Sequence, residues 1–325
     1  MKKITAITLC LMMLAGVMTA CGAHSAKGDK LSIVTTIFPE YDWVMQILGD
    51  KAESADVAML LDNGVDLHSY QPTADDIIRI STCDMFIYVG GESDKWVGDA
   101  LKEAANKDMA VLNLLETLGD KAKEEELIEG MQGVEEEGEE GEEEKGPEYD
   151  EHVWLSLRNA AELCSCISSK LCEIDPDNKD AYKANTDAYV AKLKALDNKY
   201  KDAVAAAETK TLLFGDRFPF RYLADDYGID YYAAFAGCSA ETEASFETIM
   251  FLANKVDELG LKAILQIESA DGKIAKTIKD TTKTKNQMIL VMNSMQSATS
   301  ADVKQGASYL SIMEKNLEVL KDALK

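Results

Sequence analysis

Short apolar runs alternate with amphipathic stretches of about ten residues through the first half of the chain. The apolar runs with the composition of strands cover residues 31–37, 56–61, 84–89 and 109–115. The stretches with helical spacing cover residues 39–48, 73–81 and 96–105, and a further helix is expected to begin near residue 155. Strands that alternate with helices of this length are typical of a parallel α/β sheet.

The second half repeats this alternation. Its strand-like runs are 211–215, 230–235, 263–268 and 287–293, and its helical stretches are 219–226, 245–259, 272–281 and 303–324. Between the halves, residues 178–207 have an unbroken helical pattern, which corresponds to a helix roughly 45 Å long. We therefore predict an α/β fold of two four-stranded parallel lobes joined by a long rigid helix. A ligand cleft is expected between the lobes, where the carboxyl ends of the strands face each other.

The N-terminus has the features of an export signal. Lys2 and Lys3 precede a short apolar run, and small residues lead up to Cys21. The stretch around Cys21 is similar to a bacterial lipobox, so we expect residues 1–20 to be a signal peptide and Cys21 to be lipidated, with residues 21–30 as a tether. The alternative is a plain secretory signal with an incidental cysteine. In both cases the protein is exported, and lipidation would hold it at the outer face of the cytoplasmic membrane.

Negative charge dominates the rest of the chain. The formal net charge of −24 becomes −26 when residues 1–20 are removed. Such acidity argues against a nucleic-acid partner and favours the attraction of cations. Eight of the ten residues 135–144 are glutamate, which predicts a disordered acidic loop over residues 120–148. The predicted boundaries are then 31–175 for the first lobe, 176–208 for the linking helix and 209–325 for the second lobe.

The cysteines do not indicate a disulfide framework. Beyond Cys10 and Cys21 there are five, an odd number without regular spacing: Cys83, Cys164, Cys166, Cys172 and Cys238. We interpret them mostly as small buried apolar residues.

Two histidines give the clearest indication of chemistry. The chain has only three, and His24 falls in the predicted tether, which leaves His68 and His152 in the folded part. Each has acidic residues nearby and stands where a strand or loop gives way to a helix. Imidazole is the commonest protein metal ligand, and its second ring nitrogen usually donates to a carboxylate or carbonyl. Together the two histidines predict half of a metal site, although each alone is more often an ordinary hydrogen-bonded residue.

The segments Asp66-Leu67-His68-Ser69-Tyr70-Gln71-Pro72-Thr73 and Asp150-Glu151-His152-Val153-Trp154-Leu155 carry a family resemblance. With them, the chain resembles the metal-binding solute receptors of bacterial ABC importers, in the zinc- and manganese-specific cluster. The resemblance implies two α/β lobes, metal ligation by His68 and His152, and an ABC permease with its ATPase as partners. It also implies Zn²⁺ as the transported ligand, with Mn²⁺ as the alternative.

The second lobe departs from that family's pattern. Where zinc-type relatives have a third histidine, this chain has Gly215-Asp216, so Asp216 is the predicted replacement ligand; the alternative is a helix N-cap. A later aspartate of the family corresponds to Asn293, a poor ligand for a transition metal. Glu268 is therefore the candidate for the fourth position, with a structural role as its alternative. Glu241 and Glu243 are expected to support the site or to be surface acids.

The predicted function is capture of a metal ion by a monomeric receptor. A secreted metal-dependent hydrolase is the alternative from another class, but the sequence has no His-Glu-x-x-His or Gly-x-Ser-x-Gly pattern. A surface adhesin on the same fold is a third reading. The glutamates of 135–144 could gather metal ions or form a solvated spacer.

Overall fold

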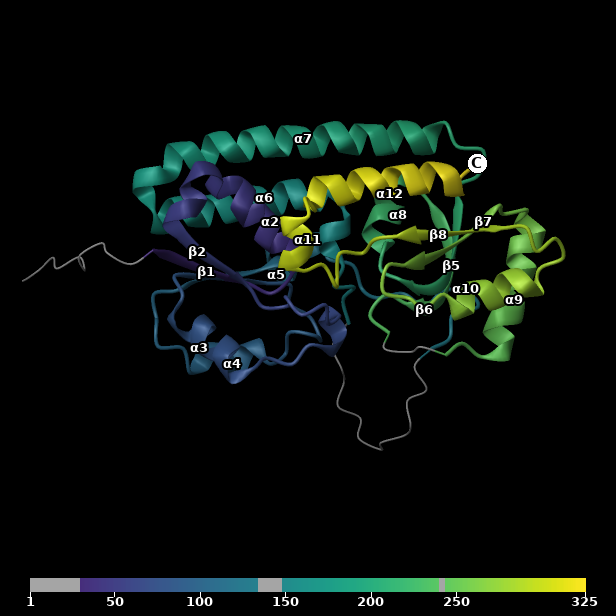
Figure 1. Cartoon of the computed structure of the whole chain (residues 1–325), viewed down its shortest axis with the longest axis horizontal. Helices are drawn as coiled ribbons and strands as arrows, with labels where there is room; N and C mark the ends of the chain where they lie inside the picture. Colours follow the sequence, from purple (N-terminus) through teal and green to yellow (C-terminus); the bar gives the residue numbers. More distant parts are fainter. Residues whose placement is uncertain (1–29, 134–147, 240–242) are drawn as a thin grey trace, which may run out of the picture. The chain divides into compact units, whose positions relative to one another are not determined.

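The apolar runs of the first half form one parallel sheet in the order β2-β1-β3-β4 (Figure 1). The computed structural model describes residues 30–133, 148–239 and 243–325. The strands are β1 (Leu31–Thr35), β2 (Ala55–Met59), β3 (Met85–Tyr88) and β4 (Ala110–Asn113). Because β1 lies between β2 and β3, the chain passes from β1 to β2 on one side and then crosses to β3 on the other side of β1. The carboxyl ends of the strands at such a switch point are where open α/β sheets bind ligands.

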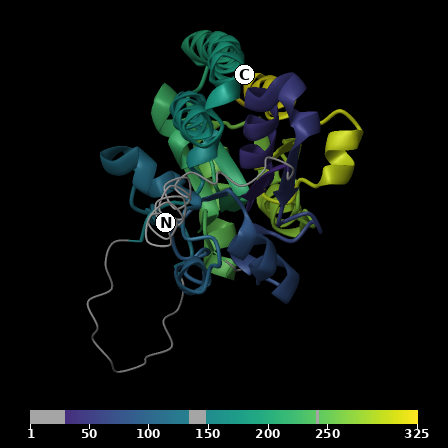
Figure 2. The same ribbon diagram turned by 90° about the vertical axis from the view of Figure 1, so that its left-hand side faces the viewer.

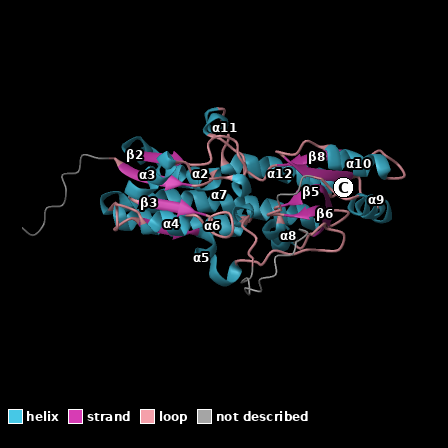
Figure 3. Cartoon of the chain, turned by 90° about the horizontal axis from the view of Figure 1, so that it is seen from below, coloured by secondary structure: helices cyan, strands magenta, loops and turns pink. Residues whose placement is uncertain are grey.

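The second half forms a second parallel sheet with the same relative order, β6-β5-β7-β8. Its strands are β5 (Thr211–Phe218), β6 (Asp230–Ala236), β7 (Ala263–Ile267) and β8 (Met288–Met292). Figure 3 shows the two groups of strands in separate halves of the described chain. The predicted α/β fold with two four-stranded parallel lobes is confirmed.

Helices pack around both sheets. They are α2 (Phe38–Leu48), α3 (Ala74–Thr82), α4 (Val97–Lys102), α5 (Leu114–Leu118), α6 (Leu157–Ile174), α7 (Lys179–Ala205), α8 (Arg221–Tyr227), α9 (Phe246–Leu259), α10 (Lys273–Thr281), α11 (Ser300–Lys304) and α12 (Tyr309–Ala323). None of the helices in the described chain has both the length and the apolar character that a membrane span requires.

The 27-residue helix α7 runs along both lobes, as Figure 1 shows from the side and Figure 2 nearly end-on. Its buried positions recur every three or four residues: Tyr182, Thr186, Tyr189, Leu193, Leu196, Tyr200 and Val204. This face packs on α2, α6 and α12. Tyr189 donates to Asp42 on α2 (3.3 Å), and Tyr200 donates to the carbonyl of Met313 on α12 (2.6 Å). The helix therefore connects the lobes through packing along its length as well as through the chain.

The predicted final helix is present as α12, but its predicted start at residue 303 is wrong, because the structure divides this region into α11 and α12. Gly306 between them has a φ of 94°, which interrupts helical geometry. Ser308 then caps α12 through a capping box with Ser311. Similarly, the predicted strand 109–115 ends at Asn113, whose side chain caps α5 by accepting the N–H of Glu116.

The flanks of the predicted acidic loop make backbone contacts with regular structure. Glu124 forms an antiparallel bridge with Tyr149, and Gln132 forms a parallel bridge with Phe235 of β6. The glutamate run 135–144, Cys21 and the segments 1–20 and 21–29 lie outside the described residues.

Candidate metal site

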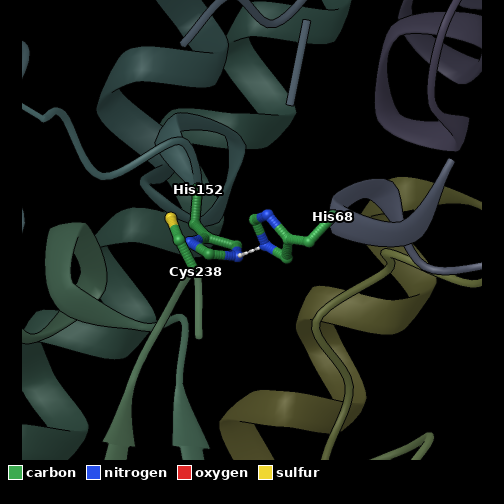
Figure 4. Close-up of side chains that lie close together, drawn as sticks. All are labelled: His68, His152 and Cys238. Atoms are coloured by element: carbon green, nitrogen blue, oxygen red, sulfur yellow. Dashed lines mark hydrogen bonds between the residues drawn. The ribbon is translucent and has the colours of Figure 1, made fainter. Parts of the chain in front are cut away.

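Two loops of the first lobe bring His68 and His152 together. His68 lies on a 3₁₀ turn after β2, where Asp66 accepts its backbone N–H (3.1 Å). His152 lies at the start of another 3₁₀ turn, and its N–H donates to Asp150 (2.9 Å). The Nε2 atoms of the two rings are 3.2 Å apart (Figure 4). The sequence prediction that these histidines share one site agrees with this geometry.

A carboxylate stands behind each ring. His68 Nδ1 is 3.3 Å from Glu151 Oε2 and 2.9 Å from the Ser93 hydroxyl, and His152 Nδ1 is 3.0 Å from Asp150. With a proton on each Nδ1, His68 faces Ser93 and Glu151, His152 faces Asp150, and both Nε2 lone pairs are free. Tetrahedral Zn²⁺ with Zn–N bonds of about 2.0–2.1 Å separates two nitrogen ligands by about 3.3 Å. The observed spacing fits a cation bound between the rings.

Hydrogen bonding and burial fix the carboxylate of Glu151 beside His68. Its Oε1 accepts the N–H of Ser93 (2.8 Å), and the side chain is 1% exposed. Burial by itself raises the pKa of this carboxyl, but the neighbouring His68 ring and the bonds from Ser93 outweigh it, so the pKa of Glu151 lies below its ordinary value. Gly91, at a φ of 82°, makes the room, since a Cβ there would lie 2.5 Å from Oε1. Glu151 is therefore placed as an anion that orients His68.

Two more buried acids lie deeper in the first lobe. Glu40 accepts the N–H of Thr36 (2.8 Å), and Asp94 accepts the N–H of Gly90 (2.9 Å). Burial and the charge of Asp94 raise the pKa of Glu40 well above its usual value. Burial, together with the charge of Glu151, raises the pKa of Asp94 to about 7. The first lobe thus places further ionisable carboxyl groups behind the histidine pair.

Asp216 lines the same cavity as His68, with a volume of about 310 Å³. It lies within β5, and α8 is capped by Phe220, so the alternative role as a helix N-cap is wrong. Its carboxylate accepts the N–H groups of Arg217 (2.8 Å) and Ile267 (3.0 Å). Burial raises its pKa despite these bonds. Its role as a metal ligand stays a prediction.

The neighbouring Arg217 reaches across to the first lobe. Its guanidinium pairs with Asp66 at 2.7 Å. Burial raises the pKa of Asp66, but the hydrogen bond and charge of Arg217 outweigh it and leave that pKa lowered. The amide of Gln296 lies between the lobes, with one end 3.1 Å from both oxygens of Asp66 and the other 3.0 Å from His152 Nε2. Sequence reasoning identified neither Arg217 nor Gln296, which have no motif of their own.

Glu268 joins the ends of β7 and β8. Its carboxylate accepts the N–H (2.7 Å) and the hydroxyl (3.0 Å) of Ser294, and burial raises its pKa. Asn293 accepts the N–H of Met295 (2.8 Å). Glu268 as a ligand also stays a prediction. Glu243 is exposed, and Glu241 lies outside the described residues.

Cys238, just after β6, is the residue that sequence reasoning missed. Its sulfur and one ring nitrogen each of His68 and His152 lie within 4.8 Å of one another (Figure 4), the one such cluster of metal-binding side chains found among the described residues. Its thiol is partly exposed, unlike the buried Cys83 and Cys164. Burial and the charges of nearby acids raise the pKa of Cys238 well above its ordinary value. A single cysteine without a spacing motif gives no signal in the sequence, so only the fold places it here.

Known proteins resemble this chain over most of its length. The family model described as zinc-uptake complex component A, periplasmic, matches residues 33–323. The high-affinity zinc uptake system protein ZnuA of Bacillus subtilis is 33% identical over 320 residues, covering 98% of this chain and 96% of that protein. The zinc-binding lipoprotein AdcA of Streptococcus pneumoniae is 34% identical over 325 residues, but this chain covers only 61% of its length. The crystal structure of the Zn(II)-bound ZnuA-like domain of that AdcA superposes with a TM-score of 0.70 at 30% identity, covering 91% of this chain and 99% of the domain.

Proposed function

This chain belongs to the family of the periplasmic zinc-uptake complex component A, and on that premise we propose that it captures Zn²⁺ outside the cytoplasm and delivers it to an ABC importer. The relatives named for zinc uptake and zinc binding support zinc as the ligand. The protein is then a binding and transport component rather than a hydrolase.

The observation that carries this proposal is the pair of facing Nε2 atoms, 3.2 Å apart, with a carboxylate behind each ring. His68 and His152 bind the ion through Nε2, while Glu151 and Asp150 hold the Nδ1 protons and fix the rings. Such carboxylates increase the basicity of ligating imidazoles. The side chains of both histidines are at least 94% buried, so a bound ion exchanges its water for protein ligands.

Zinc is favoured over manganese by these donors. Imidazole nitrogen suits Zn²⁺, and affinity for divalent ions at nitrogen and oxygen sites rises from manganese to zinc. Because protons compete for the imidazole nitrogens, zinc binding weakens at low pH. Asp216 and Glu268 are the second-lobe ligands that the sequence predicts, and each already accepts backbone N–H groups of its own lobe.

Capture takes place with little movement of the lobes. Trp154 of the first lobe donates to the carbonyl of Ser294 in the second (2.8 Å), and Tyr309 of α12 donates to the carbonyl of Trp154 (2.6 Å). Together with α7 these contacts favour local changes of loops over hinge closure. The Arg217–Asp66 pair also joins the lobes close to His68, and such a change would alter it.

The location and partners follow from the family and the N-terminus. Lipidation of Cys21 would anchor the receptor at the outer face of the cytoplasmic membrane, next to an ABC permease driven by its ATPase. We propose that the receptor acts as a monomer. The hydrolase and the adhesin stay alternatives that the geometry of the histidine pair does not favour.

The proposed function is tested by metal content and titration. We expect one equivalent of zinc in the purified protein by mass spectrometry, and a stoichiometric zinc titration after treatment with a chelator. Manganese should bind more weakly in the same assay. A wild-type protein that carries no zinc and takes up none at micromolar concentrations would contradict the proposal.

A further inference from the structure

The thiol of Cys238 lies beside the histidine pair, on the second-lobe side of the site (Figure 4). Accepting the function proposed above, we propose that Cys238 is the third zinc ligand and the one that the second lobe supplies. The site then binds zinc through two imidazoles and one thiolate. The fourth position of the tetrahedron is open to water or to a further side chain.

The geometry needs only a small adjustment. Zn–N bonds of about 2.0–2.1 Å and a Zn–S bond of about 2.3 Å place nitrogen and sulfur about 3.5 Å apart in a tetrahedral site. The sulfur already lies within 4.8 Å of a nitrogen on each ring. Rotation about the Cα–Cβ bond of Cys238 can supply the remaining approach.

The backbone around Cys238 is fixed against the site. A Cβ on Gly237 would lie 3.1 Å from the His152 ring and 2.9 Å from the carbonyl of Phe218, so glycine lets the chain pass this close. The N–H of Cys238 donates to Glu125 Oε1 (2.9 Å). Cys238 therefore follows His152 in sequence by a long interval but is held next to it in space.

The carboxylates of the second lobe are less available than the thiol. Asp216 accepts two backbone N–H groups, and Glu268 accepts the N–H and hydroxyl of Ser294. Each carboxylate therefore has fewer lone pairs free for a metal, and turning it toward the histidines would weaken these bonds. The Cys238 sulfur meets one such donor, the backbone N–H of Glu151, but sulfur is only a weak acceptor, so rotation of the thiol gives up less than turning a carboxylate does.

A groove of about 590 Å³ gives cations access to the sulfur. Its lining includes Cys238 and five glutamates: Glu92, Glu124, Glu125, Glu148 and Glu151. Carboxylates of one sign in a concave surface raise the local concentration of cations. Cys238 thus borders a groove whose acidic lining attracts cations.

A thiolate ligand makes the site selective. When zinc binds, the thiol proton leaves to solvent and a Zn–S bond takes its place, with no change in oxidation state. Thiolate sulfur favours zinc, whereas carboxylate and carbonyl oxygen suit manganese. We therefore expect Cys238 to widen the preference for zinc over manganese beyond what two histidines provide.

Cobalt substitution tests this ligand directly. Co²⁺ bound to a thiolate shows a sulfur-to-metal charge-transfer band in the near ultraviolet, which nitrogen and oxygen ligands do not produce. We expect the band in the wild-type protein and in the control Cys172→Ser, a partly exposed cysteine on α6, but not in Cys238→Ser or Cys238→Ala. Zinc affinity should fall by about 100-fold or more in Cys238→Ala, beyond the range for supporting residues, while manganese affinity changes much less.

The outcomes separate this proposal from the proposed function. Cobalt or zinc bound by the wild type without the band, and with unchanged zinc affinity in both Cys238 variants, would overturn Cys238 as a ligand. The receptor function would survive that result if His68→Ala still lost zinc. A wild type that binds neither ion would overturn both proposals. Thermal unfolding of the metal-free variants, followed by circular dichroism, identifies any variant that fails to fold. Cys238→Ser keeps nearly the size of cysteine and is therefore the variant expected to fold like the wild type.

Discussion

The two lobes share one strand order but present different side chains to the metal site. In the first lobe, each histidine has its own carboxylate, Glu151 or Asp150, and more buried acids lie behind. In the second lobe, Asp216 and Glu268 have turned their carboxylates to hydrogen-bond donors of their own lobe. What the second lobe directs at the histidines is a thiol on the loop after β6.

This difference shows what the fold determines and what it leaves to individual residues. The parallel order 2-1-3-4, used twice, brings the carboxyl ends of eight strands to the same region. Which of the side chains there can bind a metal depends on their other partners. A carboxylate that already accepts hydrogen bonds from its own lobe has fewer lone pairs free for a metal.

The largest expected effect comes from the histidines. His68→Ala and His152→Ala should each lower zinc affinity by more than about 100-fold. Each variant removes a nitrogen ligand, and losing a ligand costs more affinity than losing a residue that only supports one. Isothermal titration with a competing chelator measures this loss. His24→Ala is the matched control, because it changes the remaining histidine of the chain and should bind zinc as the wild type does. Wild-type affinity in both site variants would show that the lobes do not form a metal site here.

The next effect concerns the carboxylates that orient the rings. Glu151→Gln and Asp150→Asn keep the size of the side chain but remove the charge that holds the Nδ1 proton. We expect zinc affinity to fall by about 10- to 100-fold in each, measured by the same competition assay. Glu103→Gln, at an exposed position, is the control. If zinc affinity does not change, the charges of Glu151 and Asp150 do not contribute to metal binding. The two lobes then do not differ in how their carboxylates act on the site.

The acidity of the first lobe should be visible in its stability. The pKa of Asp94 is raised from 3.8 to about 7, first by burial, so folding favours its protonated form. The contribution of protonated Asp94 to the free energy of unfolding is fully present below 3.8, the pKa in the unfolded chain. It is lost as the pH rises through about 7, the pKa in the folded protein. Asp94→Asn imitates the protonated carboxyl and should stabilise the metal-free protein at pH 8 by roughly 2–4 kcal/mol, but have little effect near pH 4.

Urea unfolding at both pH values measures this difference. Asp108→Asn, an exposed aspartate of the same lobe, should show no such dependence. A variant that is no more stable than the wild type at pH 8 would mean that Asp94 is ionised at little cost in the folded protein.

The alternation of apolar runs and helical stretches was sufficient to predict both sheets, because burial patterns over whole elements are local in the sequence. The long helix was equally clear, since its seven buried positions keep one face over 27 residues. The break between α11 and α12 was missed, because one glycine and one capping serine decide it.

The site was only half visible in the sequence. His68 and His152 stand next to their own acids, and this local pattern made them recognisable. Cys238 and Gln296 reach the same place only through β6 and β8, and no spacing connects them to the histidines. Asp216 and Glu268 were identifiable as acids near the cleft, but their backbone partners appear only in three dimensions.

The smallest effect is the most direct test of the contrast between the lobes. Asp216→Asn and Glu268→Gln each keep the size of the side chain and one of the two accepting oxygens while removing the charge that a metal would use. If Cys238 is the second-lobe ligand, both variants should change zinc affinity by less than about tenfold, below the range for residues that orient ligands. The competition assay used for the histidine variants has the sensitivity to detect this. A loss above 100-fold in either variant would identify that carboxylate as a zinc ligand, as the sequence alone predicts, and the lobes would then share the ion through histidine on one side and carboxylate on the other.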